Sequence, residues 1–198
     1  MELGSGRHQR WVFRLNFMGE KWKVKHIQPY KKGKGLRIMV WAAFWGENWS
    51  DLIRLERDFE AKKYGYTAHS YLQLLGEMLP TIWEPGLTFM QDNAPIHSAN
   101  SVKKWFEEHA IPVMDWPPYS PDLNPIEHLW FPLKEGVSGQ DPELDHASGH
   151  SIEVEEKLWE ALQASWAMIK QGILKHLVKS MDNRVNAVIE AKGWNTRY

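Results

Sequence analysis

The chain has 198 residues, of which 43% are hydrophobic and 25% are charged, as in ordinary globular proteins. It contains no Cys, which excludes a disulfide framework and thiolate metal sites and fits a reducing intracellular compartment. No apolar run approaches the roughly 20 residues needed to cross a bilayer, and the first residues lack the apolar core of a signal peptide. We therefore expect a soluble intracellular protein without membrane contact.

The charge is distributed unevenly along the chain. Residues 1–40 carry ten Lys and Arg against two Glu, a net charge of +8, although the whole chain carries −1. Aromatic residues such as Trp11 and Trp22 interleave with these cations, a pattern that suits a nucleic-acid backbone and stacked bases. The alternative is a solvated hairpin whose lysines keep it soluble. The candidate contacts with DNA are Arg10, Arg14, Lys21, Lys23, Lys25, Lys31, Lys32 and Lys34.

The first half of the chain predicts strands followed by a helix. Residues 11–15 predict a strand, and residues 36–45 are apolar on both faces, as in an interior strand. Residues 52–55 are expected to return beside it in an antiparallel pair. Apolar residues then recur at helical spacing and stop before Pro85 and Gly86. These residues are Tyr71, Leu75, Met78, Leu79 and Ile82.

The middle of the chain alternates strands and helices. Residues 87–91 predict a short strand that runs into Asp92. Ser98 is expected to cap a helix with a buried stripe of Val102, Trp105, Phe106 and His109. Residues 111–114 predict a brief strand, followed by a rigid proline-rich loop over residues 115–124. Asn124 and Pro125 predict the start of the next helix, with Ile126, Leu129, Trp130 and Leu133 turned toward a core.

The last third predicts a polar acidic loop over residues 135–151 and then helices. One longer helix carries Leu158, Leu162, Trp166, Ile169 and Ile173, and a last short helix runs through Val185, Val188 and Ile189. This order of elements predicts an α/β fold, an RNase H-like mixed sheet flanked by helices, with its first strand missing or incomplete. We expect a core over residues 1–136, an acidic loop over 137–151, and C-terminal helices over 152–198 that pack on the core.

Two acidic residues stand where an open α/β sheet places its ligands. Asp92 follows a predicted strand, Glu127 lies in the first turn of a predicted helix, and thirty-four residues lie between them. Carboxylate oxygens are the hard ligands that Mg²⁺ prefers. Two such ions about 3.5–4 Å apart would assist in-line phosphoryl displacement. The sequence therefore offers Asp92 and Glu127 as candidate metal ligands and catalytic residues.

Each of these residues also has a purely structural interpretation. A strand-terminal Asp followed by Asn often bonds its own backbone in a turn, and Glu127 stands where a capping box would place its acidic member. His97 and His128 could contact a phosphate. A structural role, at a helix start or in a partly buried position, is the commoner one for such a His. Asp115 and Asp122 are rival carboxylates, which we interpret as a loop residue and a turn residue.

Two stretches of this region resemble the signature of the Tc1/mariner transposases. They are QDNAPIH at residues 91–97 and WPPYSPDLNPIEHLW at residues 116–130. The resemblance extends to WVFR at 11–14, KKG at 31–33, MVWAAFWG at 39–46 and VIEAKGWNTRY at 188–198, so it covers essentially the whole chain.

The resemblance implies a DDE transposase catalytic domain that cleaves DNA and transfers strands with Mg²⁺ or Mn²⁺. The second and third members of the family's D-D-E triad fall on Asp92 and Glu127, with the DD34E spacing. Asn93 and His97 would help to shape the site. The implied partners are transposon ends, target DNA and a second copy of the chain in a homodimer. Nuclear localisation follows from DNA as the substrate.

The sequence departs from the family pattern at its start. The family's first Asp stands a few residues before a segment resembling residues 2–6, whereas this sequence begins at Met1. We therefore expect little cleavage by this chain alone. Two further hypotheses stay open: a catalytically inactive, truncated or co-opted transposase remnant that binds DNA or protein, and a hydrolytic nuclease of the same fold.

Overall fold

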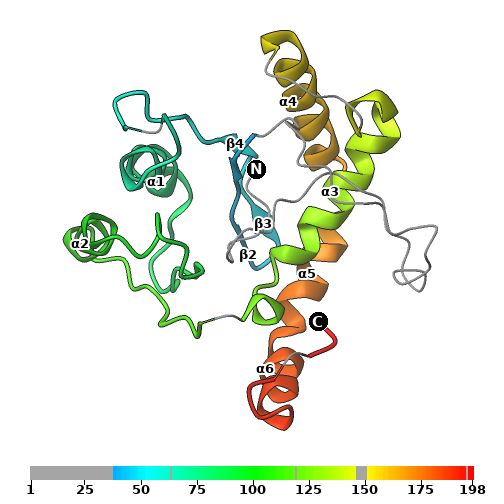
Figure 1. The fold of residues 1–198 in the computed structure, drawn as a ribbon. Coiled ribbons are helices and arrows are strands. Elements are labelled where there is room, and N and C mark those ends of the chain that lie inside the picture. Colours follow the sequence, from blue (N-terminus) through cyan, green and yellow to red (C-terminus); the bar gives the residue numbers. More distant parts are fainter. Residues whose placement is uncertain (1–37, 63, 119, 146–150, 195) are drawn as a thin grey trace. The chain divides into compact units, whose positions relative to one another are not determined.

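A computed structural model describes residues 38–62, 64–118, 120–145, 151–194 and 196–198 (Figure 1). Their chain forms two compact units. One consists of Ile38 with the described part of His128–Lys170, and the other of Met39–Glu127 with Gln171–Tyr198. The predicted strand at residues 11–15 and the basic residues up to Lys34 lie outside the described residues. The predicted domain boundaries remain a prediction.

Short antiparallel strands open the larger unit. β1 (Val40–Trp41) pairs with β4 (Ile53–Arg54), and β2 (Phe44–Trp45) pairs with β3 (Asn48–Trp49). The β2–β3 turn contains Gly46 at a φ of +57°, a left-handed conformation that costs glycine little. The predicted return of residues 52–55 beside the preceding strand is confirmed.

Besides the antiparallel pairs, the larger unit contains a parallel pairing. Phe89 and Val113 form an isolated parallel bridge. The Phe89 N–H donates to the oxygen of Pro112 at 2.7 Å, and the Met114 N–H donates to the oxygen of Phe89 at 2.8 Å. The strands predicted at 87–91 and 111–114 therefore meet side by side, although each is shorter than predicted.

Helices α1 (Ala68–Ile82) and α2 (Asn100–Glu108) pack through the apolar faces that the sequence predicts. A capping box between Thr67 and Ser70 starts α1, since each side chain accepts a backbone N–H of the other residue. The core between these helices and the adjoining strand consists of Tyr71, Leu75, Leu79, Val102, Phe106 and Ile111.

Two predictions about α2 are wrong. Its N-cap is Ala99, which makes no side-chain cap, because the Ser98 hydroxyl donates to the oxygen of Ala94 at 3.0 Å instead. His109 is exposed and stacks on Trp105 with the ring centroids 4.0 Å apart, so it lies outside the buried stripe.

Helices α5 (Gln171–Lys179) and α6 (Met181–Glu190) complete the larger unit. The long helix predicted through Ile173 is instead two helices, because α4 (Ile152–Ala167) ends before α5 begins. Leu174 and Leu177, and not Ile173, are the buried residues of α5. The last predicted helix is confirmed as α6, but its buried residue is Arg184, while Val185 and Ile189 are exposed.

The smaller unit contains α3 (Glu127–Gln140) from His128 onward, the 3₁₀ turn η3 (Pro142–Asp145) and α4. The predicted loop over 135–151 is wrong in its first part, since α3 continues to Gln140 with Val137 buried. Gly136 permits the close approach of the two helices, because a Cβ there would lie 2.8 Å from the Ser165 Cβ. Ser165 also accepts a hydrogen bond from the Gln140 amide at 2.8 Å.

Candidate active site

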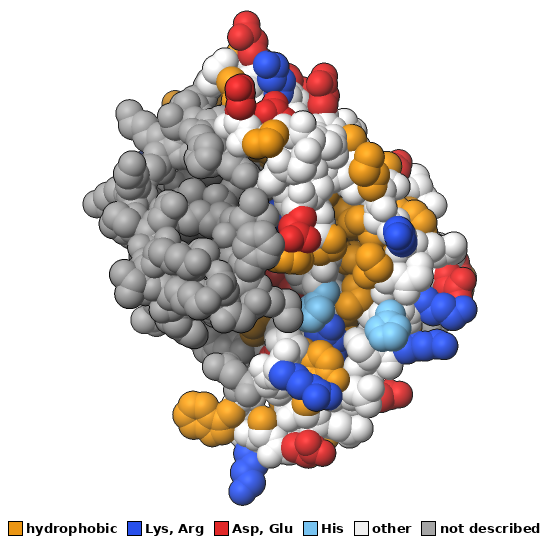
Figure 2. All heavy atoms as spheres, turned by 90° about the vertical axis from the view of Figure 1, so that its right-hand side faces the viewer, with side chains coloured by type: hydrophobic (Ala, Val, Ile, Leu, Met, Phe, Trp, Pro, Cys, Tyr) orange, Lys and Arg blue, Asp and Glu red, His pale blue; other side chains and the backbone are white. Residues whose placement is uncertain are grey.

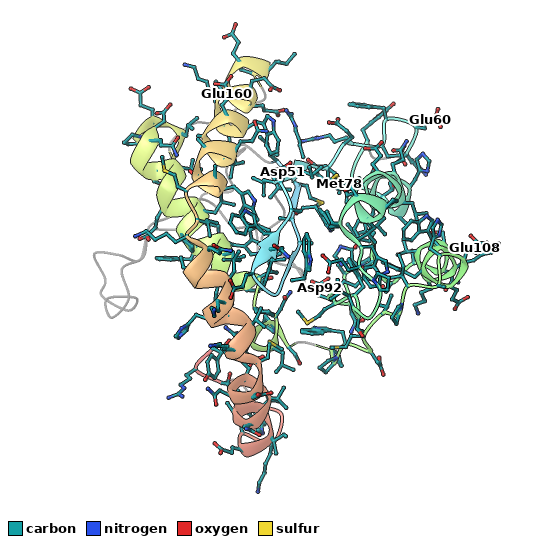
Figure 3. All side chains as sticks on the ribbon, turned by 180° about the vertical axis from the view of Figure 1, so that it is seen from behind. Asp51, Glu60, Met78, Asp92, Glu108 and Glu160 are labelled. Carbon is teal, nitrogen blue, oxygen red and sulfur yellow. The ribbon has the colours of Figure 1, made fainter. Side chains whose placement is uncertain are left out.

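Asp92 stands where the short parallel pairing ends. It follows Phe89 by three residues and precedes α2, and Figure 3 labels it on this segment. Its side chain is 32% exposed. Asp92 therefore lies at the carboxyl end of a strand segment, the edge at which open α/β sheets bind their ligands.

The Asp92 carboxylate is held by two neighbours on one oxygen. Oδ1 accepts the backbone N–H of Ala94 at 3.0 Å and lies 2.7 Å from Nδ1 of His97. Because an ionised carboxylate only accepts hydrogen bonds, Nδ1 of His97 carries the proton in this contact. The turn interpretation of Asp92 is thus confirmed. It does not compete with a ligand role, because the same contacts orient the carboxylate.

The buried Tyr71 and the half-buried Gln91 contact His97. The Tyr71 ring lies 4.5 Å from the His97 ring, between centroids. The Tyr71 hydroxyl donates to Oε1 of Gln91 at 2.7 Å, and Nε2 of Gln91 donates to the backbone oxygen of His97 at 3.4 Å. Burial raises the pKa of Tyr71, and the negative charge of Asp92 raises it further, while a hydrogen bond from Trp41 acts in the opposite direction. Tyr71 therefore remains a neutral hydrogen-bond donor beneath the site.

Asn93 joins this segment to the proline-rich loop. Its Nδ2 donates to the backbone oxygen of Trp116 at 2.7 Å, and Trp116 itself is buried. Since Trp116 follows the second strand of the parallel pair, this bond ties together the two chain segments that leave adjacent strand ends.

Glu127 is the first residue of α3, and its side chain is exposed. The helix begins two residues after the predicted start at Pro125. Before it lies the 3₁₀ turn η2 (Pro121–Leu123), and the N–H of Glu127 donates to the backbone oxygen of Asn124 at 3.2 Å. Asp92 and Glu127 both belong to the larger unit. The capping-box interpretation of Glu127 stays a prediction.

The two rival carboxylates have separate surroundings. Asp115 is exposed. Asp122 lies in η2 and accepts two hydrogen bonds from Thr196 through Oδ2. The interpretation of Asp122 as a turn residue is confirmed, but its partner 74 residues away was not predicted.

The carboxylate oxygens of Asp92 and Glu127 are the type of ligand that a hard divalent cation prefers. Within the described ranges no three His, Asp or Glu side chains form a cluster that could hold a metal ion. Mg²⁺ is often bound by one or two carboxylates, with water and substrate phosphate completing its octahedron. Asp92 and Glu127 carry oxygen ligands of this kind, His97 contacts the Asp92 carboxylate, and Asn93 bonds to the neighbouring loop.

The predicted basic contacts, Arg10 to Lys34, lie outside the described residues. On the face drawn in Figure 2, the described Lys and Arg side chains stand singly or in small groups among acidic and apolar ones. Among the described residues no helix is long and apolar enough to cross a membrane.

Known proteins resemble this chain in sequence and in fold. The family model of the DDE superfamily endonucleases matches residues 52–146. The transposable element Tc1 transposase of Caenorhabditis elegans is 31% identical over 193 residues, which are 95% of this chain and 63% of that protein. The chain therefore spans less than two thirds of the length of this relative.

Solved structures identify the fold as RNase H-like. The Mos1 strand transfer complex matches with a TM-score of 0.59 at 18% identity, over 93% of this chain and 51% of that one. The Mos1 transposase catalytic domain with raltegravir and Mg matches with a TM-score of 0.58 at 19% identity, over 81% of this chain and 77% of that one. The predicted α/β class is thus confirmed.

Proposed function

Because this chain belongs to the DDE superfamily endonucleases and to the Tc1/mariner group among them, we propose that it acts on DNA phosphodiester bonds as a transposase catalytic domain. The observation that carries the proposal is the fixed carboxylate of Asp92. It follows a strand segment and is oriented by Ala94 and His97 within a motif of the family.

In this proposal Asp92 and Glu127 bind Mg²⁺ or Mn²⁺ through their carboxylates. Bound divalent ions would activate the attacking oxygen and stabilise the leaving oxygen of an in-line displacement. His97 keeps the Asp92 carboxylate in one orientation, and Tyr71 and Gln91 hold His97. Asn93 fixes the loop beside Asp92 by its bond to Trp116. A solved relative that contains Mg supports the choice of ion.

The proposed substrate is DNA at transposon ends and at target sites. A strand transfer complex among the structural neighbours supports this substrate class. The basic residues between Arg10 and Lys34 would neutralise its phosphates, since Lys and Arg displace condensed counterions. A homodimer and a nuclear location follow from the same proposal.

Manganese calorimetry on the whole chain tests the site. We expect weak binding that Asp92→Asn and Glu127→Gln each reduce by roughly tenfold or more, as loss of a charged ligand requires. Asp115→Asn is the matched control. It removes an exposed carboxylate from the proline-rich loop over residues 115–124 and leaves both proposed ligands unchanged. Equal titrations for wild type, D92N and E127Q would contradict the proposal.

A second candidate function is binding without cleavage, as in an inactive remnant. Incubation of the chain with labelled transposon-end DNA and Mn²⁺ separates the candidates. Nicked and joined products that D92N abolishes indicate a transposase, nicks without joining indicate a hydrolytic nuclease, and retarded but intact DNA indicates a binding module.

A further inference from the structure

A buried cation lies far from the site in sequence but next to its proline-rich loop. Arg184 of α6 is 1% exposed. Its Nε donates to the Ser180 hydroxyl at 2.8 Å, and one terminal nitrogen donates to the backbone oxygen of Asp122 at 2.7 Å. The guanidinium carbon also lies 4.9 Å from the centre of the Tyr198 ring. Arg184 thus links α6, the C-terminal segment and η2.

Asp122 receives a second link through its side chain. Oδ2 accepts the backbone N–H of Thr196 at 3.1 Å and the Thr196 hydroxyl at 2.8 Å. The same hydroxyl oxygen accepts the N–H of Tyr198 at 3.3 Å. Both the backbone and the carboxylate of Asp122 are therefore fixed by residues more than sixty positions later in the chain.

From Asp122 a short series of turns leads to Glu127. The N–H of Leu123 donates to Ser120, that of Asn124 to Pro121 and that of Glu127 to Asn124, in each case to a backbone oxygen. Pro121 and Pro125 fix their own φ angles within this stretch, and Pro125 is buried. Residues 123–127 therefore form a stiff segment, and the position of Asp122 fixes the position of Glu127 at the start of α3.

The chemistry of this cluster suits positioning better than general packing. Burial is the main cause that lowers the pKa of Arg184, and electrostatic interactions with Tyr198 and Asp122 act in the opposite direction. An apolar side chain would fill the same space without the cost of removing a charge from water. A guanidinium instead offers several donors in a rigid fork, which fixes the direction as well as the distance of η2.

We propose that Arg184, Thr196 and Asp122 form a positioning cluster through which the C-terminal segment sets the place of Glu127 in the metal site. This inference rests on the proposed function, because it assumes that Glu127 is a ligand. In it Asp122 is not itself a ligand, since its Oδ2 is engaged by Thr196. The cluster acts on the metal only through Glu127.

Manganese calorimetry of the whole chain tests the cluster with conservative pairs of variants. Thr196→Val keeps the branched shape but loses the hydroxyl, whereas Thr196→Ser keeps the hydroxyl. Arg184→Met removes the donors at similar length, and Asn186→Ala changes an exposed residue of α6 as a control. Circular dichroism with a chelator present, at the temperature of the titration, verifies that each variant is folded.

We expect the Mn²⁺ Kd to rise about tenfold in R184M and about threefold in T196V, in line with partners that orient metal ligands. T196S and N186A should bind as wild type does. Should R184M fail to fold, the T196V and T196S pair decides alone. Wild-type affinity in T196V, with a clear loss in E127Q, would overturn the positioning role and leave the metal site intact. Wild-type affinity in E127Q would overturn the metal site itself, and the positioning role with it.

Discussion

The two halves of the candidate site are held in opposite ways. Asp92 is fixed by Ala94 and His97, two and five residues further along. The approach to Glu127 is fixed through Asp122 by Arg184 and Thr196, 62 and 74 residues away. A carboxylate can thus be oriented by its own turn, or by a distant segment that holds the start of its helix. The first arrangement takes its direct contacts from neighbouring residues, whereas the second depends on the folded C-terminal segment.

The largest change should come from the support beneath Asp92. Tyr71→Ala removes a fully buried ring and should lower the free energy of unfolding by about 3–5 kcal/mol. Tyr71→Phe keeps the ring but loses the hydroxyl, which donates to Gln91 and accepts a hydrogen bond from Trp41, so a loss of about 1–2 kcal/mol is expected. Urea unfolding measures both. Equal losses in the two variants would mean that the hydroxyl, and not the packing, supports this half.

Next in size is the loss of the distant link. Arg184→Met leaves the Asp122 oxygen and the Ser180 hydroxyl without a donor, which should cost about 2–3 kcal/mol in the free energy of unfolding. Asn186→Ala on the same helix should change it by less than about 0.5 kcal/mol. If R184M unfolds at the same urea concentration as N186A, the Arg184 contacts do not stabilise the segment before Glu127, and the contrast between the two halves is contradicted.

A glycine pair in the smaller unit gives a reference outside both halves. Gly136→Ala would bring a Cβ within 2.8 Å of Ser165, so we expect a loss of about 1–2 kcal/mol. Gly139 has nothing within 4 Å of such a Cβ, and Ala there should be neutral or stabilising by up to about 1 kcal/mol. Thermal unfolding compares the two variants, and neither should alter the Mn²⁺ affinity of the folded protein.

The smallest effect concerns a carboxylate with a purely structural contact. The Thr67 hydroxyl donates to Asp58 at 2.7 Å and is the main cause that lowers the pKa of Asp58. The stability from this contact is present above the ordinary pKa of Asp58 and is lost as the pH falls through the lowered value. Thr67→Val should raise the pKa of Asp58 and Thr67→Ser should not, as carboxyl NMR titration would show. An unchanged Asp58 pKa in T67V would assign the shift to another contact.

The local half of the site could be predicted from the sequence. The strand before Asp92 and the turn after it follow from short-range patterns, because an Asp followed by Asn favours a bond to its own backbone. The spacing of Tyr71, Leu75 and Leu79 matches the helical period and predicts α1, which carries these residues. The resemblance of residues 91–97 to a known motif then added the chemistry that the spacing leaves open.

The distant half could not be predicted in the same way. Apolar periodicity in the last helix drew the prediction to Val185 and Ile189, which are exposed, and away from Arg184, which is buried. The only signal for Arg184 was a Ser four residues earlier, where an i to i+4 bond can form. The polar stretch from 135 predicts a loop, because nothing in it reveals that Gly136 packs against Ser165.

The sequence by itself predicted the resemblance to the family, the α/β class and the two candidate carboxylates, because these depend on motifs and periods within short stretches. Only the tertiary structure decided which residues hold the segment that leads to Glu127. Hydrogen bonds between Asp122, Arg184 and Thr196 join segments far apart in the chain. Such contacts form only when folding has closed the intervening loop, so no local pattern records them.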